Sequence, residues 1–249
     1  MKKSFPEKTL LILLSILMLM YGGYLIFIYF SGKVQLLIHP DYAFLTLISG
    51  VTLLALGVAG LAAVTTQKKF SSERINRGTK GELLIIIITI IGALLIQPAP
   101  LSTSTAMVRK SGLNDDAGIS RRVEPVARFI MNSKKRRLIE WVNLFNQDPD
   151  PSQYEGQKAK VSGFVLKDED LPQDYFMIAR FILSCCAADA RPIGIPVRFD
   201  PSAQTFENDQ WIELTGEFFT SELDGETIPA IELTNYKNIP VPENPYANL

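Results

Sequence analysis

The 249-residue chain has few of the residues on which most enzyme active sites and disulfide-linked folds depend. With one histidine it offers no obvious hydrolase triad. Its two cysteines are too few for a disulfide framework, and they are adjacent rather than arranged as Cys-x-x-Cys. A phosphate loop of the Gly-x-x-x-x-Gly-Lys type is also missing. We therefore expect a protein that is not an enzyme.

Long apolar runs occur only in the first hundred residues. Leu10–Phe30 and Phe44–Thr66 contain no charged residue, and each can cross a hydrocarbon core of about 30 Å at about 1.5 Å per residue. The third run, Leu83–Gln97, would cover only about 22 Å as a helix before two prolines interrupt it. The sequence therefore predicts a transmembrane domain, residues 1–100, with spans at about 10–30, 44–66 and 83–100.

The flanking charges predict the orientation of these spans, because Lys and Arg near membrane helices are retained on the cytoplasmic side. The segment before the first run carries three lysines, and the loop between the second and third runs carries five Lys and Arg. The loop between the first and second runs holds only Lys33. The sequence therefore predicts a multi-pass protein of the cell membrane with a cytoplasmic N-terminus and an extracytoplasmic C-terminal domain.

The two halves of the chain differ in charge. Residues 1–100 carry 9 Lys and Arg against 4 Asp and Glu, whereas residues 101–249 carry 16 against 22. Because nucleic-acid binding depends on clustered cations, we expect no nucleic-acid partner for the acidic half. Residues 101–132 have no clear apolar period and are rich in Ser, Thr, Gly, Asn and Asp, which predicts a linker to a domain at 133–249.

One amphipathic helix is predicted at the start of this domain. Apolar residues from Leu138 to Phe145 recur at the i, i+3, i+4, i+7 spacing of a single helix face. Ser133 is the expected N-cap of this helix. The basic run 134–137 is expected to form its solvated face, with a contact to outer-leaflet head groups as the alternative.

The remainder of the domain has the pattern of strands. Five short segments rich in β-branched and aromatic residues are separated by turn residues, and Asp224-Gly225 suits a tight hairpin. Gly163 and Gly216 fall inside strands, where a missing side chain allows the sharp bends that close a small barrel. We therefore predict a mainly-β domain, an OB-like five-stranded barrel. The predicted strands are 158–166, 175–183, 195–199, 211–219 and 228–236.

The most distinctive chemical feature is the run Ser184-Cys185-Cys186-Ala187-Ala188-Asp189 after the second predicted strand. Two thiolates are soft ligands for Zn²⁺, Cu⁺ or a thiophilic metalloid, and Asp189 could add an oxygen ligand. Adjacent strand residues point to opposite faces, so both thiols could reach one ion only if the chain leaves the strand here. Buried structural thiols and a vicinal disulfide or redox pair are the alternatives.

His39 is a candidate third ligand. It lies in the sequence His39-Pro40-Asp41-Tyr42, in the loop before the second span, on the membrane side expected for the cysteines. A composite site of His39, Cys185, Cys186 and Asp189 is chemically reasonable, and zinc or another soft metal ion is the cofactor that such a donor set would take. The alternative is an interfacial histidine among lipid head groups beside Tyr42.

Four segments carry a family resemblance: His39-Pro40, Gly163-Phe164-Val165, the stretch from Arg180 through Cys185-Cys186 to Ala190, and Trp211-Ile212-Glu213-Leu214-Thr215-Gly216. Together they resemble the YcgQ-like family of permease subunits, and the resemblance covers nearly the whole chain. It implies a multi-pass bacterial membrane protein with an extracytoplasmic domain, acting beside a larger YraQ/ArsP-like permease. It supplies no catalytic residue.

The residues and the resemblance together predict an auxiliary membrane subunit of a permease or transport system. Its outer-face barrel would bind a metal ion or a thiophilic substrate, and its partners would be a YraQ/ArsP-like multi-pass permease and the lipid bilayer. Three helices without buried charges are too few for an independent carrier. The alternative function is a membrane-anchored thiol redox protein that uses the Cys185-Cys186 pair.

Overall fold

A computed structural model describes residues 7–65, 98–109 and 136–247, together with 87–89, 91–92 and 95. The chain divides into two units, Met1–Ala99 and Pro100–Leu249, and each is described by itself. Half of the expected third span, 83–100, and most of the expected linker, 101–132, lie outside the described residues.

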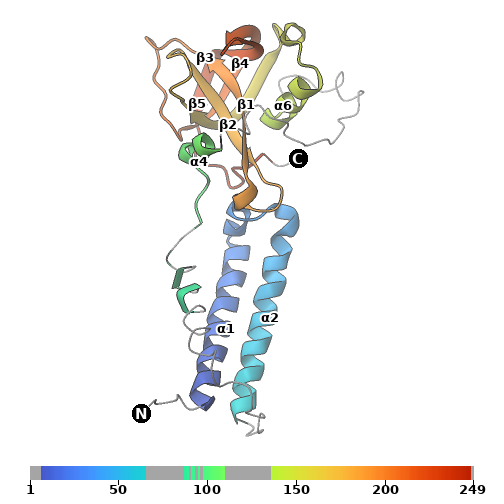
Figure 1. Ribbon diagram of the computed structural model, residues 1–249, viewed down its shortest axis with the longest axis vertical. Helices are drawn as coiled ribbons and strands as arrows, with labels where there is room; N and C mark the ends of the chain where they lie inside the picture. The colour runs from blue at the N-terminus through green and yellow to red at the C-terminus, as the bar shows by residue number, and fades with distance from the viewer. Residues whose placement is uncertain are drawn as a thin grey trace. The chain divides into compact units, whose positions relative to one another are not determined.

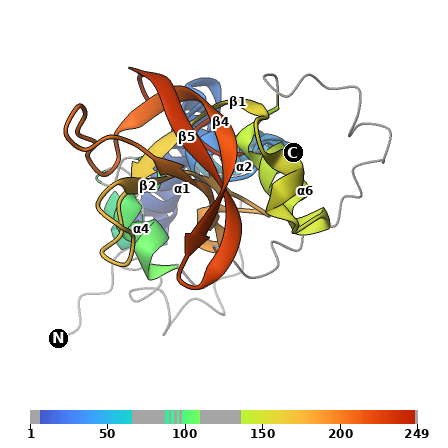
Figure 2. The same ribbon diagram turned by 90° about the horizontal axis from the view of Figure 1, so that it is seen from above.

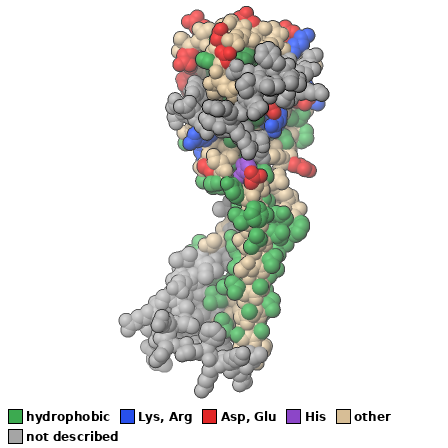
Figure 3. Space-filling model, turned by 90° about the vertical axis from the view of Figure 1, so that its right-hand side faces the viewer, with side chains coloured by type: hydrophobic (Ala, Val, Ile, Leu, Met, Phe, Trp, Pro, Cys, Tyr) green, Lys and Arg blue, Asp and Glu red, His purple; other side chains and the backbone are tan. Residues whose placement is uncertain are grey.

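Two long helices make up most of the described part of the first unit (Figure 1). They are α1 (Glu7–Phe30) and α2 (Pro40–Thr65), joined through the short 3₁₀ helix η1 (Lys33–Leu36). Hydrophobic side chains cover much of the helix surface in Figure 3. Among the described residues, two helices are long and apolar enough to cross a membrane, Leu11–Phe30 and Pro40–Thr65. This confirms two of the three apolar segments as candidate spans.

Glycines bring the two helices close together. A Cβ atom added at Gly50 would lie 3.0 Å from the carbonyl oxygen of Gly22, and one at Gly57 would lie 2.8 Å from the side chain of Leu19. Larger side chains at these positions would force the helices apart. The packing is therefore of the small-residue kind that membrane helices use.

Five strands form the second unit, and they are hydrogen-bonded in the order β1-β2-β3-β5-β4 (Figures 1 and 2). Because β4 also pairs with β1, the sheet closes on itself as a barrel. All neighbouring pairs are antiparallel except β3 and β5, which are parallel. The strands are β1 (Lys158–Leu166), β2 (Tyr175–Ile182), β3 (Arg191–Arg198), β4 (Trp211–Leu223) and β5 (Glu226–Asn238).

The predicted turn and bend residues have the expected roles. Asp224 and Gly225 have φ angles of 54° and 78° and connect the paired ends of β4 and β5, as a two-residue hairpin turn requires. Gly216 lies at an irregularity in the pairing of these strands, and an added Cβ there would collide with the carbonyl oxygen of Glu232. A Cβ atom added at Gly163 would likewise collide with the backbone of Ala179 on β2.

Helix α6 (Leu138–Gln147) and the short helix α4 (Thr103–Val108) lie on opposite sides of the sheet (Figures 1 and 2). Trp141 of α6 is fully buried and packs on Phe218 of β4, with ring centroids 4.6 Å apart. On the other face of the sheet, Phe164 stacks on Phe181, and Ala106 of α4 joins this second cluster. The two helices therefore cover different apolar surfaces of one barrel.

Two expectations near these helices need correction. α6 begins at Leu138 with Arg137 as its N-cap, not at Ser133, because Glu140 accepts a hydrogen bond from the Arg137 amide at 2.9 Å. In the basic run 134–137, Arg137 is exposed as expected, but Arg136 is 91% buried and its guanidinium lies 4.8 Å from the Trp141 ring centroid. Within the expected linker, Thr103–Val108 form α4, which packs on the barrel.

Candidate metal centre

The two cysteines lie in a turn that leaves the barrel. Strand β2 ends at Ile182, and the short 3₁₀ helix η5 occupies Ala187–Asp189 before β3 begins. Cys185 and Cys186 fall between these elements, so strand alternation no longer sends their side chains to opposite faces. The condition under which both thiols could reach one ion is therefore met.

The carboxylate of Asp189 organises this turn. Its Oδ1 accepts a hydrogen bond from the amide of Ser184 at 3.0 Å, and its Oδ2 accepts from the amides of Cys185 at 2.8 Å and Cys186 at 3.2 Å. Partial burial opposes ionisation, but the Cys185 thiol and the three amides outweigh it and lower the pKa of Asp189 to about 2. Asp189 is therefore ionised at neutral pH.

The ligand atoms of Cys185, Cys186 and Asp189 all lie within 4.8 Å of one another. Both thiols are free, Cys185 is exposed and Cys186 is half-buried, so the alternative of buried structural thiols is wrong. Hydrogen bonding to the Asp189 carboxylate, together with the neighbouring Cys186 thiol, raises the pKa of Cys185 to about 12. The Cys185 thiol is therefore protonated at neutral pH.

An arginine that follows α4 contacts the far side of the turn. The Nη1 atom of Arg109, which follows α4, donates hydrogen bonds to the carbonyl oxygens of Ala187 at 3.2 Å and Ala190 at 2.6 Å. Sequence reasoning missed Arg109 because it lies in the expected linker and its partners are far away in the chain. No local pattern could have identified this contact.

His39 lies in the first unit, whereas Cys185, Cys186 and Asp189 lie in the second. It precedes α2, where its Nδ1 accepts a hydrogen bond from the amide of Asp41 at 3.3 Å and lies 3.7 Å from the Asp41 carboxylate. Its ring centroid is 6.1 Å from that of Tyr42. These contacts are those of a helix-capping residue, and a ligand role for His39 stays a prediction.

Chemically, the turn offers two sulfur donors and one carboxylate on an accessible surface. A soft divalent cation would favour the sulfur donors and would displace their protons, because metal-bound thiols ionise. Three protein donors leave a position of a tetrahedral ion open to water or another ligand. Such a site suits exchangeable binding better than a closed structural metal.

Comparison with known proteins gives two results. The model of the DUF1980 N-terminal domain matches residues 13–113, and that of the DUF1980 C-terminal domain matches residues 127–248. The chain is also similar to the UPF0703 protein YcgQ of Bacillus subtilis (strain 168), with 26% identity over 98 residues, which are 39% of this chain. The matched region spans about a third of the length of that relative, 34%.

Proposed function

Because the chain belongs to the DUF1980 family, whose domains cover both of its halves, we propose that it is an auxiliary subunit of a membrane transport system. Its barrel binds a soft metal ion or a metalloid at Cys185 and Cys186. The observation that carries the proposal is the convergence of two free thiols and one carboxylate on an exposed turn. Asp189 positions the thiols and is available as a third ligand.

The strand order and the parallel pairing of β3 with β5 support an OB-like barrel as the scaffold of this turn. Two apolar helices support attachment to a membrane. On this proposal the N-terminus is cytoplasmic and the barrel extracytoplasmic, and a YraQ/ArsP-like permease is the partner that receives or supplies the bound species.

Thiol redox chemistry has less support as the function. A redox cysteine attacks as its thiolate, and the raised pKa of Cys185 suppresses that form at neutral pH. A metal ion supplies its own driving force for deprotonation, whereas a disulfide substrate does not. The same hydrogen bond therefore hinders redox turnover more than metal binding.

The metal proposal is tested by calorimetric titration of the full-length chain in maltoside detergent with Zn²⁺. We expect one ion to bind with proton release, which is measured by repeating the titration in buffers of different ionisation enthalpy. The Cys185→Ser/Cys186→Ser variant should lose this binding. Asp200→Asn is the matched control, because Asp200 also caps a turn, accepting from the Ser202 amide at 2.9 Å, but has no thiol beside it in sequence.

Equal zinc binding by wild type and by the double serine variant would contradict the metal proposal. His39→Ala tests the composite site separately, and unchanged affinity in this variant would remove His39 as a ligand. Transport association is tested by mild-detergent purification, which should recover a polytopic permease. Full transport by the reconstituted chain alone would contradict the auxiliary role.

Orientation is tested by labelling with an impermeant maleimide on intact cells, in the double serine background. Ser111→Cys should be labelled and Ser72→Cys should not. The reverse pattern would contradict an extracytoplasmic barrel.

A further inference from the structure

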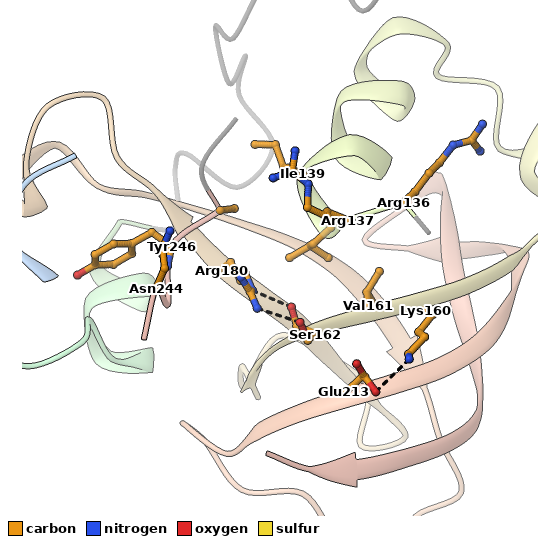
Figure 4. Close-up of a pocket in the computed structure, with 12 residues that line it drawn as sticks. Arg136, Arg137, Ile139, Lys160, Val161, Ser162, Arg180, Glu213, Asn244 and Tyr246 are labelled. Atoms are coloured by element: carbon orange, nitrogen blue, oxygen red, sulfur yellow. Dashed lines mark hydrogen bonds and ion pairs between the residues drawn. The ribbon is translucent and has the colours of Figure 1, made fainter. Parts of the chain in front are cut away.

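A second site lies where β1, β2 and α6 meet. A cavity of about 360 Å³ opens there, which is within the size range of small-molecule sites (Figure 4). Four of its lining side chains are cationic and one is acidic. The charged lining residues are Arg136, Arg137, Lys160, Arg180 and Glu213.

The cavity exists because β1 and β2 separate. The two strands pair only from Phe164 to Leu166 on β1 and from Met177 to Ala179 on β2. Beyond this point Arg180 bridges the gap, with its Nε donating to the carbonyl oxygen of Ser162 and its Nη2 donating to the Ser162 hydroxyl, both at 2.8 Å (Figure 4). These bonds use one edge of the guanidinium and leave the Nη1 edge for another acceptor.

The positive charge of Arg180 has no acidic partner among the described residues, since its hydrogen bonds go to neutral oxygens of Ser162. Burial, and then the nearby charge of Arg137, lower the pKa of Arg180, so its charged form is disfavoured here. Among the described residues that line the cavity, Glu213 is the one acidic residue, and it is already shared by Lys160 at 3.3 Å and Lys237 at 2.8 Å. A partly buried guanidinium in this position lacks a counter-charge.

We propose that this cavity binds a phosphate-bearing ligand, with the Arg180 guanidinium as its principal contact. A phosphate group accepts hydrogen bonds from several directions, whereas a single carboxylate would use one guanidinium edge. Here Arg180 and Lys160 line the cavity from β2 and β1. Arg137, which precedes α6 and pairs with Glu140 at 3.0 Å, also lines it.

The start of α6 adds donors of a different kind. Leu138 and Ile139 are the first residues of the helix, and both line the cavity. The first amide groups of a helix have no partner within it, and the helix dipole favours negative charge at this end. The cavity is larger than one phosphate group, so it can also hold the organic part of a phosphate ester.

The test is direct titration of the full-length chain in maltoside detergent, which contains no phosphate, with inorganic phosphate and with glycerol 3-phosphate. Wild type should bind both, and Arg180→Gln should bind about ten- to a hundredfold more weakly. The matched control is Arg198→Gln. Arg180 lies 5.4 Å from the Trp211 ring centroid, and Arg198 is likewise a strand arginine beside a ring, 4.1 Å from the Phe219 centroid. Arg198, however, is paired to Glu232 and does not line the cavity.

Equal affinity in wild type and Arg180→Gln, or failure of wild type to bind either compound, would overturn the proposal. If Arg180→Gln does not fold, Lys160→Gln replaces it, because Lys160 is exposed, and its affinity should fall several-fold. A second arm offers vesicles of phosphatidylglycerol or phosphatidylcholine. Competition by phosphatidylglycerol vesicles would identify a lipid head group as the source, and lack of competition would identify a soluble phosphate ester.

Discussion

Strand β2 and the turn that follows it carry the two proposed binding surfaces, which have opposite chemistry. The turn presents thiols around an ionised carboxylate, a donor set for a cation. The cavity beside Arg180 presents guanidinium and ammonium groups, a donor set for an anion. They also differ in construction, because backbone amides from the turn itself organise Asp189, whereas the cavity needs β1, β2 and α6 together. The turn therefore depends on residues close together in the sequence, whereas the cavity depends on tertiary contacts between distant segments.

The largest expected effect is a loss of stability from removing the packing between α6 and the barrel, which lies beside the cavity and not in the thiol turn. Trp141→Ala removes a fully buried ring that packs on Phe218 and beneath Arg136, and should destabilise the barrel by about 3–5 kcal/mol in chemical denaturation. Trp141→Phe should cost much less, because it keeps an aromatic ring and removes an indole N–H that has no hydrogen-bond partner among the described residues. Equal losses in the two variants would contradict packing as the cause.

A second experiment sharpens the chemistry of the turn. Asp189→Asn removes the negative charge beside Cys185, so the pKa of that thiol should fall from about 12 toward its ordinary value of about 8.5. In a Cys186→Ser background at pH 8, iodoacetamide should then alkylate Cys185 at least about tenfold faster, because the thiolate is the reactive form. Asp200→Asn is the control, and an unchanged alkylation rate in Asp189→Asn would contradict the assigned hydrogen bond.

The smallest expected effect is a dependence of stability on pH. The folded-state pKa of Asp189, about 2, is below its unfolded value, so its contribution is present above about pH 4 and is lost as pH falls toward 2. Wild type should therefore lose more thermal stability than Asp189→Asn as the pH falls from about 4 to about 2. Identical acid profiles would show that the turn contributes nothing to folding.

Local sequence patterns were enough to predict the elements whose partners are near in sequence or whose alternation is regular. The bounds of β1, 158–166, were predicted as the structure has them, and Asp224-Gly225 was correctly placed in a hairpin. β3 begins at Arg191 rather than at the predicted 195, so the strand contains Pro192 as well as Pro196. Both prolines pair with β2, and β5 joins the other edge of β3 only at Val197, so their missing N–H groups cost no ladder bond there.

The features that escaped prediction depend on contacts distant in sequence. α4 has too few apolar residues to predict a helix, yet the Thr103 amide donates to the Asp209 carboxylate and the Asp209 amide donates to the Thr103 hydroxyl at 3.1 Å. The cysteines and Asp189 could be singled out because they are adjacent in the sequence. Arg180 was visible only as part of a family resemblance, since its role depends on strands that separate in the folded barrel.

The central claim is that the thiols of the turn act as metal ligands, and X-ray absorption at the zinc edge tests it most directly. The full-length chain is loaded with one equivalent of Zn²⁺, with the Cys185→Ser/Cys186→Ser variant as the control. We expect two sulfur ligands at about 2.3 Å and oxygen or nitrogen ligands at about 2.0–2.2 Å in wild type. A wild-type spectrum with only oxygen and nitrogen ligands would contradict the claim.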